Sequence, residues 1–109
     1  MKVPDGSKIE QFKQLIAMEP NDPVLHYGLG MEYQRLGDFG AAAEEFRRTT
    51  ELKPDYSAAY RELGKVLEKL DQNQEASSTY RKGVEVAKQN GDLQTMKEIE
   101  VFLRRLGVE

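Results

Sequence analysis

The feature that most constrains the fold of this chain is a pattern that recurs after 34 residues, as when Pro20 is followed by Pro54. Residues of like size recur at the same interval through most of the chain. The matching pairs are Leu29 and Leu63, Gly30 and Gly64, Tyr33 and Leu67, and Ala42 and Ala76, with an aromatic series of Phe12, Phe46 and Tyr80. A period of this length, carried by helical segments, indicates a stack of similar helix pairs.

Six segments have apolar residues at helical spacing, and no stretch alternates with the period of two that marks a strand. Pro20 and Asp22-Pro23 end one helix and begin the next, and Pro54-Asp55 repeats that stop. Ser7 is expected to cap the first helix, with Glu10 completing a capping box. The sequence therefore predicts an all-α chain. The predicted helices span 7–19, 23–36, 39–52, 57–70, 74–89 and 92–106.

Gly30 and Gly64 fall inside predicted helices, where glycine costs about 1 kcal/mol relative to alanine. Two helices approach closely only where side chains are small, so recurrent glycines indicate a recurrent crossing. We expect Gly30 to lie near Ala42 and Gly64 to lie near Ala76.

Bulk composition excludes several function classes. The 109 residues suit one domain, and their net charge of −3 disfavours binding to nucleic acid, which requires a basic face. No apolar run reaches the roughly 18–20 residues that cross a membrane, and residues 1–6 lack the apolar core of a secretory signal. The absence of cysteine excludes disulfides and thiolate metal sites. We expect a cytoplasmic protein that binds neither membranes nor nucleic acid.

Residues able to carry chemistry are few. His26 is the only histidine, and without cysteine it does not form a recognisable zinc set. The glycines fit neither a phosphate-binding loop nor a dinucleotide fingerprint. The carboxylates of Glu44, Glu45 and Asp92 are interpreted as solvated faces or helix caps. The sequence predicts no enzyme, no cofactor and no metal.

These motifs resemble those of tetratricopeptide repeat proteins, whose consensus has W, L, G and Y on the first helix, A, F and A on the second, and a closing P. His26 and Tyr60 stand where the consensus has tryptophan, and Lys88 stands where it has the second closing proline. The first copy reads His26, Leu29, Gly30, Tyr33, Ala42, Phe46, Thr49 and Pro54, and the second reads Tyr60, Leu63, Gly64, Leu67, Ala76, Tyr80, Gly83 and Lys88.

The resemblance implies a superhelix of antiparallel helical hairpins in one domain over 1–109. It divides the chain into a half-repeat helix (7–22), two full repeats (23–56 and 57–90) and a capping helix (92–106). It also implies a non-catalytic scaffold for protein–protein interaction, which binds a peptide or protein segment in a concave groove lined by the first helix of each repeat.

The resemblance implies that residues two, five, nine and twelve of each repeat line the groove, and steps of three and four keep them on one side of a helix. The first helices contribute an apolar half and a basic half, so we expect a partner with an apolar anchor and an acidic or carboxylate end. Arg61 and Lys65, one turn apart, are predicted to bind a carboxylate jointly. The groove residues are Val24, Tyr27, Met31, Gln34, Ala58, Arg61, Lys65 and Glu68, and the closing helix is expected to add Gln94, Lys97, Val101 and Arg104.

Chaperone-binding relatives hold their ligand with a carboxylate clamp of lysine and two asparagines. This chain has Tyr27, Met31 and Glu62 at those three positions, so no chaperone tail is predicted. The alternative function is an assembly subunit that docks, or forms a homodimer, through its terminal helices, because large apolar patches mark interfaces. The apolar residues of the closing helix are Leu93, Met96, Ile99, Phe102, Leu103 and Leu106.

Overall fold

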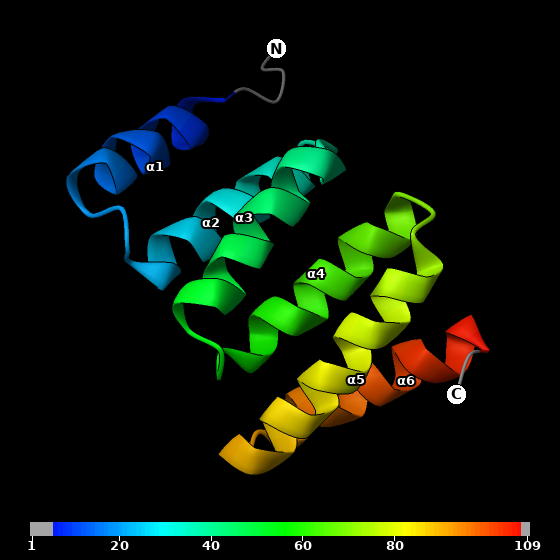
Figure 1. Cartoon of the computed structure of the whole chain (residues 1–109). Helices are drawn as coiled ribbons and strands as arrows, with labels where there is room; N and C mark the ends of the chain where they lie inside the picture. The colour runs from blue at the N-terminus through cyan, green and yellow to red at the C-terminus, as the bar shows by residue number, and fades with distance from the viewer. Residues whose placement is uncertain (1–5, 108–109) are drawn as a thin grey trace.

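A computed structural model describes residues 6–107, and within that range every regular element is a helix (Figure 1). The predicted all-α class is therefore confirmed. The expectation that residues 1–6 form no secretory signal falls almost wholly outside the described range, which excludes residues 1–5. The helices are α1 (Ser7–Met18), α2 (Pro23–Arg35), α3 (Phe39–Leu52), α4 (Ser57–Lys69), α5 (Asn73–Asn90) and α6 (Leu93–Leu106).

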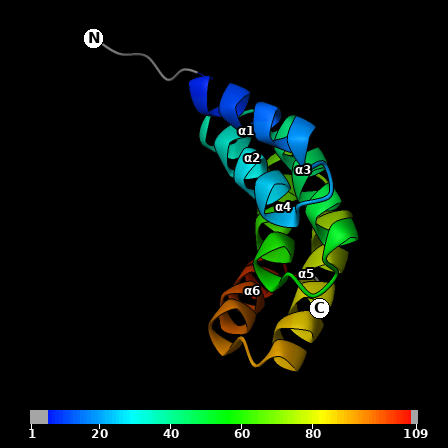
Figure 2. The same cartoon turned by 90° about the vertical axis from the view of Figure 1, so that its left-hand side faces the viewer.

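Each helix packs against the next one in sequence, and α4 also touches α6. The helices follow one another down a curved stack from α1 to α6, with α2, α4 and α6 on one side (Figure 2). The chain extends over 40 × 30 × 22 Å, which fits an elongated stack better than a sphere. No described helix combines the length and the apolar character that a membrane crossing requires.

Aspartates begin three of the helices, and one glycine ends α2. Asp22 accepts a hydrogen bond from the amide of Val24 at 2.9 Å, and Asp38 and Asp92 cap α3 and α6 in the same way. Gly37 has a φ of +82°, a left-handed conformation that a side chain would disfavour. The predicted cap at Ser7 is wrong. Ser7 is already the first residue of α1. The capping position is occupied by Gly6, which has no side chain to accept a hydrogen bond from the helix.

The core lies where the aromatic series meets the glycine series. Phe46 and Tyr80 are fully buried, and Leu63, Leu67, Ala42, Ala76 and Ile99 surround them. A β-carbon on Gly30 would lie 2.6 Å from Cε1 of Phe46, and one on Gly64 would overlap the Tyr80 ring. The three atoms nearest to each missing β-carbon belong to a ring, and the expected closeness of Gly30 to Ala42 and of Gly64 to Ala76 stays a prediction. The small residue makes room for an aromatic side chain.

Candidate functional site

The predicted apolar half of the groove lies on α2 and is open to solvent. Val24 is 59% exposed and Met31 is 36% exposed. Between them in sequence, Tyr27 is half-buried and stacks on Tyr56 with ring centroids 5.0 Å apart. Burial, followed by the charge of Glu62, raises the pKa of Tyr27, so its ring presents a neutral aromatic surface.

Arg61, one of the two cations in the predicted basic half, already forms ion pairs with other residues of the protein. Nε of Arg61 donates to Oε2 of Glu62 at 2.8 Å, and Nη1 of Arg61 donates to Glu98 of α6 at the same distance. Glu62 is only 3% exposed, so its charge requires a close partner. Burial lowers the pKa of Arg61, but the ion pairs with Glu62 and Glu98 outweigh burial and raise it. Arg61 thus joins α4 to α6.

Lys65 is more available than Arg61. Its Nζ lies 3.2 Å from Oε1 of Glu62, and its side chain is 42% exposed. That carboxylate oxygen forms no hydrogen bond of acceptable geometry, so the attraction between the two groups is mainly one of charge. The two basic residues predicted to act together therefore differ, since Arg61 is a structural link and Lys65 faces solvent.

A hollow of about 570 Å³ lies between α4 and α6, where Lys65 and Glu68 line it together with three residues outside the predicted site. These three residues are Lys69, Phe102 and Arg105. Arg104, the residue expected to continue the groove, instead lines a separate hollow with Arg81 and Val84 of α5. The four-residue step from Lys65 to Lys69 and the basic last turn of α6 were visible in the sequence.

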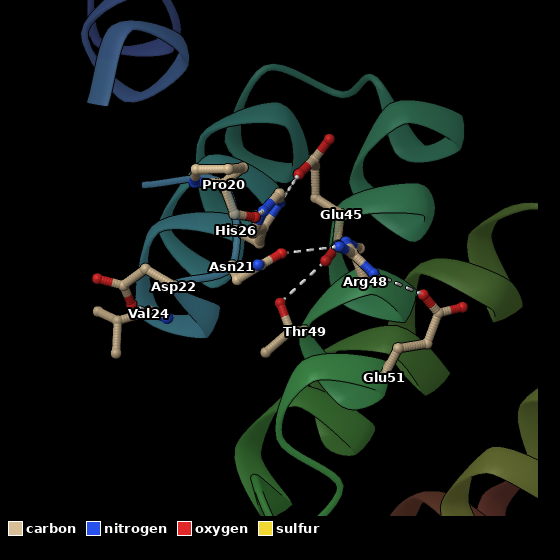
Figure 3. Close-up of polar contacts among 9 residues, drawn as sticks. All are labelled: Pro20, Asn21, Asp22, Val24, His26, Glu45, Arg48, Thr49 and Glu51. Carbon is tan, nitrogen blue, oxygen red and sulfur yellow. Dashed lines mark hydrogen bonds and ion pairs between the residues drawn. The ribbon is translucent and has the colours of Figure 1, made fainter. Parts of the chain in front are cut away.

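His26 connects α2 to the loop before it and to α3. Its Nε2 donates to the Pro20 carbonyl at 2.7 Å and its Nδ1 lies 2.8 Å from Glu45 of α3 (Figure 3). Tyr60, the matching residue of the second copy, donates its hydroxyl to the Pro54 carbonyl at 2.7 Å. Both copies therefore place a donor where the resembled family has the indole of tryptophan. No set of three or more potential metal ligands gathers anywhere in residues 6–107.

Asp92 also has a structural partner. One of its oxygens caps α6, and the other accepts from the Ser57 hydroxyl at 2.7 Å at the start of α4. Hydrogen bonds from Ser57 and Thr95 lower the pKa of Asp92. Glu45 pairs with His26, while Glu44 lies exposed on α3. Asp92 and Glu44 match the interpretation as a cap and a surface group, but Glu45 does not, because it is partly buried and paired with the buried His26.

Residues 23–56 and residues 57–90 each match the tetratricopeptide repeat family. The chain is 36% identical over 98 residues to a TPR repeat-containing protein of Pseudomonas aeruginosa, covering 90% of this chain and 93% of that protein. It resembles the solution structure of a Bordetella parapertussis protein with a TM-score of 0.80 at 31% identity, over 98% of this chain and 90% of that one. The fold also matches the first TPR of Spaghetti (RPAP3), solved with an HSP90 peptide, with a TM-score of 0.80 at 24% identity, over 91% and 74% of the two chains.

Proposed function

The chain belongs to the tetratricopeptide repeat family, and from this we propose that it is a non-catalytic module that binds a polypeptide segment along the inner face of α2, α4 and α6. Proteins of this family serve protein–protein interaction, and the related fold of Spaghetti (RPAP3) was solved with a bound peptide. No described side chains form a metal-binding group, and His26 and Asp92 have structural partners.

One observation carries the proposal: large apolar side chains are exposed on α2 beside an aromatic pair. Val24 and Met31 remain partly open to solvent. Tyr27 and Tyr56 supply a rigid surface next to them. Methionine and aromatic side chains are enriched at protein interfaces because they adapt to, or bury large areas against, a partner. The inner face of α2 is therefore the apolar anchor of the groove.

A pair of matched double variants tests this assignment. Val24→Glu/Met31→Glu places two charges on the inner face, and Met18→Glu/Leu93→Glu places two charges on exposed apolar residues of α1 and α6. We expect the first variant to lose the natural partner by at least about tenfold in affinity, because each new carboxylate must be desolvated on binding. The readout is retention of the partner from an extract of the native cells, with helicity checked by circular dichroism.

The control variant decides between the two candidate functions. Met18 is 78% exposed on α1 and Leu93 is 55% exposed at the start of α6, which favours docking through the ends as the second candidate. Most of the α6 apolar face, however, packs on the core through Ile99, Phe102 and Leu106. We expect the control variant to keep the partner. If it loses the partner and the inner-face variant keeps it, the ends of the stack are the binding surface.

A further inference from the structure

We propose that the hollow between α4 and α6 is an anion-binding subsite that receives carboxylate side chains of an acidic peptide segment. This inference rests on the proposed groove function and names the chemistry of its occupant. Three of the five lining side chains are cationic, namely Lys65, Lys69 and Arg105. The chain as a whole has a net charge of −3, so an overall excess of basic residues does not explain this cluster of cations.

Two of the cations have no anionic partner in the described part of the chain. Lys69 and Arg105 are exposed, and none of the ion pairs formed between residues 6 and 107 includes either of them. Most arginines of the same range do have a carboxylate partner, as Arg35 has Glu32 and Arg47 has Glu75. As far as residues 6–107 are concerned, Lys69 and Arg105 can therefore bind an anionic ligand.

Each of these two cations lies over an aromatic ring. The guanidinium of Arg105 lies 5.0 Å from the centroid of the Phe102 ring, and Nζ of Lys69 lies 6.0 Å from that of Phe39. A cation over a ring face is attracted by the ring quadrupole, and stacking restricts the side chain before any ligand arrives. Phe102 also gives the hollow an apolar wall, which suits an apolar residue next to a carboxylate in the partner.

Glu68, the one carboxylate that lines the hollow, already has a hydrogen-bond partner in the core. Glu68 accepts a hydrogen bond from the Tyr80 hydroxyl, which comes from the core. Burial, followed by that hydrogen bond, raises the pKa of Tyr80, so the phenol stays a donor. Lys65 is already paired with Glu62, so the positive excess of the hollow comes from Lys69 and Arg105.

The occupant is an acidic peptide because the hollow continues the groove. Lys65 and Glu68 belong both to the predicted inner stripe of α4 and to the lining of the hollow. Val24 and Met31 of α2 belong to the same predicted stripe, so a peptide bound along the inner face would contact both the apolar residues and the cations. Arginine matches a carboxylate with two parallel N–H donors, and the lysines add charge without fixed geometry.

Two synthetic probes and two variants test the subsite. The probes are a short peptide of leucine and glutamate and its counterpart with glutamine at every glutamate. Lys69→Gln/Arg105→Gln removes the two unpartnered cations, and Lys13→Gln/Lys88→Gln removes the same charge from exposed positions outside the hollow. Binding is followed by NMR titration of the full isotope-labelled chain at low salt, where exposed charges are least screened.

The glutamate peptide is expected to shift the amide signals of Lys69, Phe102 and Arg105 and to bind at least about tenfold more tightly than the glutamine peptide. The hollow variant should lose that preference, and the control variant should keep it. Equal binding of both peptides, or equal loss in both variants, would overturn the subsite while leaving the groove function standing. Absence of any shift in the hollow would overturn it too, whereas the groove function depends on the retention of the natural partner.

Discussion

Replacing Tyr80 with alanine is expected to remove about 3–5 kcal/mol of folding stability, as large aromatic deletions in protein cores do. The Tyr80 side chain is fully buried, its ring fills the space left by Gly64, and its centroid lies 5.6 Å from that of Phe102. One residue therefore joins α4, α5 and α6. Since domains are stable by only about 5–15 kcal/mol, the variant should be largely unfolded or close to it. Urea unfolding followed by far-UV circular dichroism measures the loss.

Two companion variants separate the contribution of the ring from those of the hydroxyl and of bulk hydrophobicity. Tyr80→Phe keeps the ring and removes the donor to the Glu68 carboxylate, so it should lose about 1.5–3 kcal/mol, less than the loss of the whole ring. Met18→Ala deletes a large apolar side chain that is 78% exposed and should change stability by no more than about 0.5 kcal/mol. If Tyr80→Ala unfolds at the same urea concentration as the parent chain, Tyr80 does not hold the stack together.

Gly64→Ala is expected to destabilise the protein by about 1–3 kcal/mol, although alanine is the better helix former. The new β-carbon would overlap the Tyr80 ring, which is fully buried and has little room to move. Either α4 and α5 move apart or the ring leaves its rotamer. Thermal and urea unfolding of the parent and the variant report the difference.

Gly40 supplies the matched control because it also lies in a helix, α3, and its β-carbon would meet nothing within 4 Å. Gly40→Ala should therefore stabilise the protein by up to about 1 kcal/mol. Opposite signs for the two substitutions are the expected result. A gain in stability from Gly64→Ala would show that the glycine is not required by the crossing.

The helix boundaries were predictable because the residues that set them lie within a few positions of each boundary. Proline after α1 and α3 and aspartate before α2, α3 and α6 act within a few residues, and the repeat interval confirms each assignment against its copy. The burial of Phe46 and Tyr80 also follows from their place in the aromatic series. The error at Ser7 is a shift of one residue, because the capping position is Gly6 and the helix begins at Ser7.

The partners of side chains across helices were not predictable in the same way. Each residue turns a helix by about 100°, so a shift of one position in α6 exchanges Arg104 for Arg105 at the hollow. The ion pair between Arg61 and Glu98 joins residues far apart in sequence, and spacing within one helix contains no information about it. The stacking of Tyr27 on Tyr56 likewise depends on how the loop before α4 places its last residue.

The most direct measurement of the central claim is site-specific photocrosslinking from the two faces of the stack. A photoreactive amino acid replaces Met31, on the proposed inner face of α2, in one variant and Glu44, exposed on α3, in the other. Irradiation in an extract of the native cells should attach a polypeptide at position 31 and leave position 44 unattached. Attachment at position 44 alone would contradict the assignment of the inner face as the binding surface.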